Sequence, residues 1–228
     1  MTSSAAPAPP RSGENPHLAA GAECWGEEED APVAVLAVHG RTQSPDDMRA
    51  LAERLDVEGL RWLAPAAAGQ SWYPYGFMEE RPDDDPWLTW SLEAVDEHLG
   101  RLGAAGWPPE RVVLLGFSQG ACLLAHWALL HPRRYAGLVL LTGGYVGAER
   151  EEVSFSGDFG ATPALLAGCE DDPWVPRTRM AQTEGWLRGM GAQLTSLIEP
   201  GSEHEVTGTA AELTARLLRH TVSATGRR

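Results

Sequence analysis

A serine lies between two glycines in the segment LLGFSQGACLL, residues 114–124, at the end of an apolar run. Gly116, Ser118 and Gly120 fit the G-x-S-x-G pattern of a nucleophile elbow, in which a strand turns so sharply into a helix that the serine is exposed. A Cβ atom at either glycine would collide with the neighbouring strand or helix. The pattern therefore predicts that Ser118 is a nucleophile for acyl transfer, if a strand precedes it and a helix follows it.

A serine hydroxyl is a weak nucleophile until a base takes its proton, and a histidine held by a carboxylate can serve as that base. In proteins with this elbow the histidine comes last in the chain. Only His204 and His220 follow every strand that we predict. His204 comes directly after the last strand, whereas His220 lies in the last turn of a helix, where it could compensate the helix dipole. We predict that His204 is the base.

The carboxylate should follow the strand predicted at 163–168. The segment CEDDPWVP places Glu170, Asp171 and Asp172 there. We favour Asp172, because the proline that follows restricts its backbone to conformations suited to a rigid loop. Asp171 remains the alternative.

Acyl transfer also requires fixed N–H donors for the oxyanion that develops on the substrate. One donor is expected from the backbone of Gln119, directly after the serine. The other is expected from Arg41, in the loop after the first predicted strand, where Gly40 permits a tight turn. We interpret His39, at the end of that strand, as a residue that braces the loop and not as the base.

Short, continuously apolar runs alternate with helical patterns from about residue 33 onward. Continuous apolarity is typical of strands covered on both faces of a parallel sheet. We predict strands at 33–38, 60–65, 111–116, 137–142, 163–168 and 192–199. Helices are predicted at 44–55, 86–102, 119–131, about 178–188 and 209–220. The alternation indicates an α/β fold with a doubly wound, mostly parallel sheet and helices on both faces.

The composition indicates one α/β domain at 18–222, between a disordered Ala/Pro/Ser-rich tail at 1–17 and a short C-terminal tail at 223–228. The amino terminus lacks the pattern of a secretory signal, and we expect a cytoplasmic location. No apolar run is long enough to span a bilayer, so we expect no stable membrane insertion. The three cysteines are too scattered for a disulfide framework or a zinc site.

The formal net charge of −14 argues against nucleic acid as a partner. No H-E-x-x-H or P-loop pattern occurs, and we expect neither a metal nor another cofactor. The expected partner is a small-molecule ester or thioester, and tryptophans exposed near the pocket would suit a homodimer.

Five segments, HGRTQSPDDM, PAAAGQSWYPYGF, LLGFSQGACL, DPWVP and PGSEH, together resemble the phospholipase/carboxylesterase family of α/β-hydrolases, which includes acyl-protein thioesterases. The resemblance covers about residues 31–220. It implies a triad of Ser118, Asp172 and His204, with oxyanion donors at Arg41 and Gln119. The sequence departs from the family pattern where a threonine, residue 42, replaces a glycine and where a tryptophan, residue 174, replaces a small or imidazole side chain.

The connection from residue 65 to about 86 is long for a compact domain, and loops of this length are often functional. Its aromatic residues, together with the tryptophan of the acid loop, are candidates to line a substrate pocket: Trp72, Tyr73, Tyr75, Phe77 and Trp174. For those in the long connection, the alternative is that they cover the core.

The sequence therefore predicts a cofactor-independent serine hydrolase that cleaves esters or thioesters of small to medium acyl groups through an acyl-enzyme. Two alternatives remain at this point. One is an acyltransferase or chain-releasing thioesterase, which passes the acyl group to an acceptor other than water. The other is a non-catalytic ligand-binding relative, against which the complete set of triad residues argues.

Overall fold

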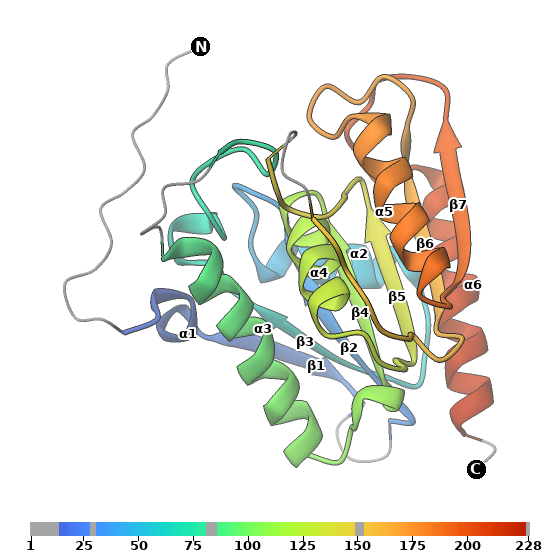
Figure 1. Cartoon of the computed structure of the whole chain (residues 1–228). Helices are drawn as coiled ribbons and strands as arrows, with labels where there is room; N and C mark the ends of the chain where they lie inside the picture. The colour runs from blue at the N-terminus through green and yellow to red at the C-terminus, as the bar shows by residue number, and fades with distance from the viewer. Residues whose placement is uncertain (1–13, 28–30, 81–85, 149–152, 227–228) are drawn as a thin grey trace.

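A seven-stranded sheet forms the centre of the computed structural model, which describes residues 14–27, 31–80, 86–148 and 153–226 (Figure 1). The strand order is β1-β3-β2-β4-β5-β6-β7. All neighbouring strands are parallel except β1, which pairs antiparallel with β3. This is the doubly wound α/β fold that the sequence predicts.

The six parallel strands follow the predicted apolar runs to within a residue at either end. They are β2 (Val33–Val38), β3 (Leu60–Pro65), β4 (Val112–Phe117), β5 (Gly137–Leu141), β6 (Pro163–Cys169) and β7 (Gln193–Glu199). Every residue of β2 and β5 is buried. Continuous apolarity in the sequence thus corresponds to burial on both faces of the sheet.

Helices cover both faces of the sheet. In Figure 1, α3 (Trp87–Ala104), α4 (Gln119–Leu130) and α5 (Arg177–Gly189) lie on the near face. The far face carries α2 (Pro45–Leu55) and α6 (Gly208–Thr225). Each face has its own cluster of buried hydrophobic side chains. Short 3-10 turns at Ala68–Gln70 and Pro109–Arg111 complete the elements.

Two elements near the amino terminus differ from the sequence-based expectation. Helix α1 (Pro16–Ala20) begins inside the segment 1–17 predicted as a disordered tail, and residues 1–13 lie outside the described residues. Strand β1 (Ala22–Gly26) lacks an apolar run and is mostly exposed, so its position comes from its hydrogen bonds with β3. At the other end, α6 continues to Thr225, past the predicted domain boundary at 222.

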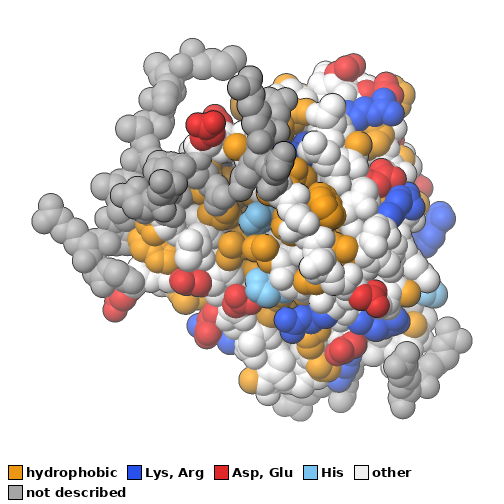
Figure 2. Space-filling view, viewed as in Figure 1, with side chains coloured by type: hydrophobic (Ala, Val, Ile, Leu, Met, Phe, Trp, Pro, Cys, Tyr) orange, Lys and Arg blue, Asp and Glu red, His pale blue; other side chains and the backbone are white. Residues whose placement is uncertain are grey.

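Charged side chains of both signs are interspersed on the molecular face that Figure 2 shows, with hydrophobic side chains scattered among them. Lys and Arg side chains do not gather there into one large patch. Among the residues described, no helix combines the length and apolarity needed to cross a membrane.

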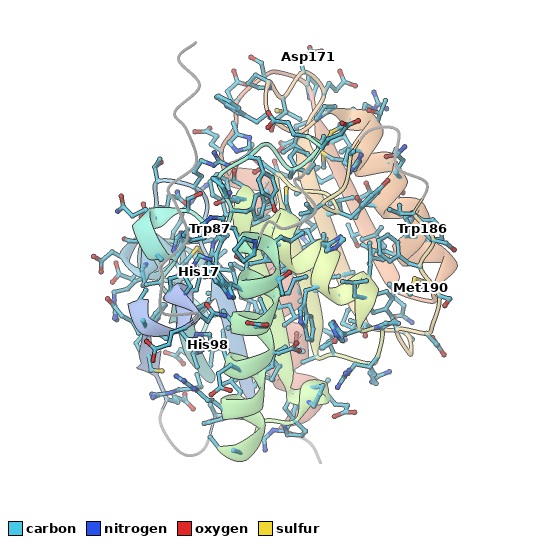
Figure 3. The ribbon with its side chains drawn as sticks, turned by 60° about the vertical axis from the view of Figure 1, so that its left-hand side comes forward. His17, Trp87, His98, Asp171, Trp186 and Met190 are labelled. Carbon is cyan, nitrogen blue, oxygen red and sulfur yellow. The ribbon has the colours of Figure 1, made fainter. Side chains whose placement is uncertain are left out.

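His17 of α1 is fully buried against α3 and the segment that follows β3 (Figure 3). Its Nδ1 accepts a hydrogen bond from the amide of Ala68 at 3.1 Å. Its Nε2 lies 3.2 Å from the hydroxyl of Ser91, which in turn donates to the carbonyl of Trp72. Because Nδ1 is an acceptor here, the neutral Nε2–H tautomer fits this site and the imidazolium does not.

His39, at the end of β2, has a matching arrangement. Its Nε2 accepts from the amide of Ala67 at 3.1 Å, and its Nδ1 donates to the carbonyl of Gly40 at 2.7 Å. Two buried neutral histidines therefore hold consecutive backbone amides after β3. Burial lowers the pKa of both rings, and it lowers the pKa of His17 to about 4.

Replacement of His17 by asparagine should make the protein less sensitive to acid. The unfolded chain binds a proton at His17 below about pH 6.5, whereas the folded protein resists protonation until about pH 4. The neutral His17 therefore makes its full contribution to the free energy of unfolding above pH 6.5, and this contribution is lost as the pH falls toward 4. Relative to His17→Asn, the parent should lose up to about 3 kcal/mol of unfolding free energy across this window.

Urea unfolding at several pH values measures this difference. His220→Asn, at an exposed position of α6, is the matched control and should keep the acid sensitivity of the parent. A constant stability difference between the parent and His17→Asn from pH 7.5 to 4.5 would contradict the assignment.

Candidate active site

Ser118 occupies the sharp turn between β4 and α4, with φ 52° and ψ −120°. Its positive φ is strained for a residue with a side chain, and such strain is common at functional sites. A Cβ at Gly116 would lie 2.7 Å from the amide nitrogen of Ala121, and one at Gly120 would lie 2.1 Å from the carbonyl oxygen of Val38. Both glycines are required by close backbone contacts, as the sequence pattern predicts.

Three predicted residues from separate loops meet at the carboxyl ends of the strands. The Oγ of Ser118 lies 2.7 Å from Nε2 of His204, and Nδ1 of His204 lies 2.8 Å from Oδ2 of Asp172. The Asp172 side chain is 1% exposed and that of His204 is 18% exposed. A carboxylate at Nδ1 favours the tautomer with hydrogen on Nδ1, which leaves a lone pair on Nε2 facing the serine hydroxyl.

The carboxylate of Asp172 is held firmly on its other side. Its Oδ1 accepts hydrogen bonds from the amides of Trp174 and Val175 at 2.8 and 3.0 Å. Asp171 is instead exposed at the upper tip of the molecule in Figure 3, and its amide donates to the carbonyl of Gly201. Of the two neighbouring acids, only Asp172 contacts His204 in the structure.

Neither alternative histidine contacts Ser118. Both ring nitrogens of His39 are engaged with backbone groups, and His220 is exposed on α6. Cys122 lies one helical turn after the serine, but burial raises the pKa of its thiol to about 12. The thiol therefore stays protonated at neutral pH and is a poor nucleophile.

The loop after β2 passes next to the serine. A Cβ on Gly40 would lie 3.2 Å from the Cβ of Ser118. Thr42 takes a positive φ of 64°, a conformation that suits the glycine of the family pattern, and its amide donates to the carbonyl of Gln70. Within the described part of the chain, the amides of Arg41 and Gln119 donate to no acceptor. Both predicted oxyanion donors are therefore available.

The side chains of these two residues hold the segment 71–75. The guanidinium of Arg41 donates to the carbonyls of Tyr73, Pro74 and Tyr75 at 2.5–3.1 Å. The amide group of Gln119 accepts from the Trp72 amide at 2.9 Å and donates to the Tyr73 carbonyl at 2.7 Å. These contacts could not be predicted from the sequence, because they join segments more than 30 residues apart.

The predicted pocket residues fall into two groups. Trp72 is fully buried, and its indole N–H donates to the carbonyl of His39, so its ring is a structural element and a direct substrate contact is not supported. Tyr73 is also buried and stacks on Tyr75. Tyr75 and Phe77 are half-buried at the edge of the core, whereas Trp174 is 69% exposed beside the acid loop. The last three remain candidates for substrate contact.

Among the residues that the structure describes, no group of three or more His, Cys, Asp or Glu side chains is arranged to hold a metal ion. The side chains gathered at Ser118 instead form a chain of proton donors and acceptors.

Residues 62–221 match the family described as Phospholipase/Carboxylesterase. Acyl-protein thioesterase 1 of Schizosaccharomyces pombe is 24% identical over 188 residues, which cover 76% of this chain and 84% of the relative. The crystal structure of a phospholipase/carboxylesterase from Dyadobacter fermentans superposes with a TM-score of 0.81 at 31% identity, covering 86% of this chain and 95% of that one. The Bacillus cereus carboxylesterase shares the fold, with a TM-score of 0.69 at 18% identity, over 88% of this chain and 93% of its own.

The sequence match extends over most of the sheet and includes the elbow, the acid loop and the histidine loop. The match to the Dyadobacter fermentans structure extends over most of this chain at 31% identity. The chain therefore belongs to the phospholipase/carboxylesterase family of α/β-hydrolase enzymes.

Proposed function

We propose that the protein is a serine hydrolase that cleaves carboxylic esters or thioesters of small to medium acyl groups through an acyl-enzyme. The observation that carries the proposal is the continuous line from Ser118 through His204 to Asp172, with contacts of 2.7 and 2.8 Å. Relatives named acyl-protein thioesterase and carboxylesterase support the same class of substrate.

The geometry suits a two-step reaction. Ser118 attacks the substrate carbonyl as His204 takes its proton, and the amides of Arg41 and Gln119 stabilise the negative charge that develops on the carbonyl oxygen. His204 then donates the proton to the leaving oxygen or sulfur, and the bond from that atom to the acyl carbon breaks. In the second step, His204 activates water, which hydrolyses the acyl-enzyme and frees the serine.

Ser118→Ala should fold normally and lose about a million-fold in kcat, the loss typical of a missing triad serine. His204→Ala should lose a similar factor, because the hydroxyl then has no base. Hydrolysis of p-nitrophenyl esters and acyl thioesters of graded chain length measures the effect, and a fluorophosphonate probe reports the reactive serine. Parental rates in Ser118→Ala, or full labelling in His204→Ala, would refute the proposal.

Asp172→Asn should lower kcat by about ten-thousand-fold, because an amide N–H facing Nδ1 favours the wrong tautomer of His204. The retained Oδ1 of the asparagine can still accept from the two loop amides, so the loop should keep its shape. Asp171→Asn is the matched neighbour and should change kcat less than about twofold, since its side chain is exposed. A severe loss in Asp171→Asn beside a normal Asp172→Asn would move the acid one residue upstream.

Arg41→Met keeps the backbone donor and removes the side-chain contacts with the segment 71–75. We expect kcat/KM and the rate of fluorophosphonate labelling to fall roughly 10- to 100-fold, because misplaced groups near a reacting centre are costly. Arg41→Lys should recover part of this loss. Arg101→Met, which removes an exposed ion pair on α3, is the control and should leave both rates unchanged. Parental rates in Arg41→Met would show that the contacts of the Arg41 side chain with the segment 71–75 do not position the site.

A further inference from the structure

A hollow of about 410 Å³ opens between α2 and the loop that carries His204. Its apolar lining comprises the exposed Ala50 and an apolar wall of Met48, Leu51, Phe117 and Val206. His204 itself belongs to the lining, and the rings of Phe117 and His204 lie 5.6 Å apart. The hollow therefore adjoins the base and the residue that precedes the nucleophile.

The hollow and the aromatic segment lie on opposite faces of the sheet. The apolar wall continues the hydrophobic cluster beneath α2 and α6. Tyr75 and Phe77 pack instead on the cluster of the other face, beneath α3, α4 and α5. Ser118 is not in the lining of the hollow, but its neighbours Phe117 and His204 are, so the two faces of the sheet present different surroundings beside the site.

The proton balance of the reaction decides which half lies on which face. The proton that His204 takes from Ser118 must pass to the oxygen of the departing alcohol as the bond between that oxygen and the acyl carbon breaks. The alcohol must therefore lie next to His204. We infer that the hollow beside α2 is the subsite for the alcohol half of an ester, an inference that rests on the proposed function.

Hydrogen bonds connect residues that line the hollow to the loops on either side of it. Gln43, in its lining, accepts a hydrogen bond from the amide of Gly40 at 2.8 Å, which ties it to the oxyanion loop. Arg54 donates to the carbonyl of Val206 at 2.7 Å, which ties α2 to the histidine loop. A preformed site of this size accommodates a small ring or a short branched chain.

The charges at the hollow select against anions. Its ionisable lining residues besides His204 are Asp47, Arg54 and Glu205. Two carboxylates thus accompany one guanidinium, and Arg54 already donates to a backbone carbonyl. The subsite therefore fits an uncharged alcohol with an apolar body, such as an aryl-methyl alcohol, and disfavours alcohols that carry a carboxylate or phosphate.

The test compares butyrate esters of methanol and benzyl alcohol, which share one acyl group and have alcohols of similar acidity. The parent should hydrolyse the benzyl ester with roughly 10-fold or greater kcat/KM, the range that an apolar pocket supplies. Ala50→Trp, at an exposed residue that lines the hollow, should reduce this ratio about tenfold by filling it. Glu53→Trp, exposed on the same helix outside the lining, should leave the ratio unchanged.

Two further substrates separate the outcomes. A 4-carboxybenzyl butyrate should react with a lower kcat/KM than the benzyl ester. Glu205→Gln should reduce the ratio of these two kcat/KM values about two- to threefold. Methyl esters of acetate, butyrate and hexanoate should give the same acyl-length profile in the parent and in Ala50→Trp.

An altered acyl profile with an unchanged alcohol ratio in Ala50→Trp would place the acyl group in the hollow and overturn the inference. An unchanged ratio and profile in a folded Ala50→Trp would also overturn it, while methyl butyrate hydrolysis by the parent would leave the proposed function intact. A parent that hydrolyses no ester and is not labelled by a fluorophosphonate would refute the proposed function itself.

Discussion

The close contact at Gly120 is the constraint on which the site depends. Only a residue without a side chain lets the first turn of α4 rest on the carbonyl groups of Val38, the last residue of β2, and of His39, which follows it. Gly143, just after β5, has the same role on the other side, because a Cβ there would lie 2.4 Å from the Cβ of Ala121. The start of α4 is thus held between two strand ends, and the serine that precedes it is fixed relative to both.

Buried polar side chains also fix the backbone of the segment after β3. The rings of His17 and His39 accept hydrogen bonds from its backbone amides. The side chains of Arg41 and Gln119 bind the carbonyl groups that follow, in the segment 71–75. Satisfied buried polar groups favour one arrangement of the backbone, because every alternative leaves some of them unpaired. Arg41 and Gln119, the two residues proposed to supply the oxyanion donors, thereby also hold the segment 71–75 through their side chains.

The parallel strands and the elbow could be predicted from local sequence, because a buried strand is a continuous apolar run and an elbow needs glycines at fixed spacing. Strand β1 could not, since it is exposed and is held by pairing with a distant strand. His17 follows a stretch rich in Ala and Pro, and its burial depends on residues more than 50 positions away. Trp72 is of a residue type common in pockets, but its hydrogen bond to the His39 carbonyl keeps it in the core.

Helix α2 supplies half of the residues that line the hollow beside His204, and it forms the crossover between β2 and β3. Specificity for the alcohol therefore depends largely on residues in consecutive turns of a single helix. These residues lie outside the long connection and the acid loop. Residues such as 47, 50, 51 and 54 could be randomised together without a change in loop length or in the reacting groups. Selection for the alcohol, including one mirror-image form of a chiral alcohol, can then evolve separately from selection for the acid.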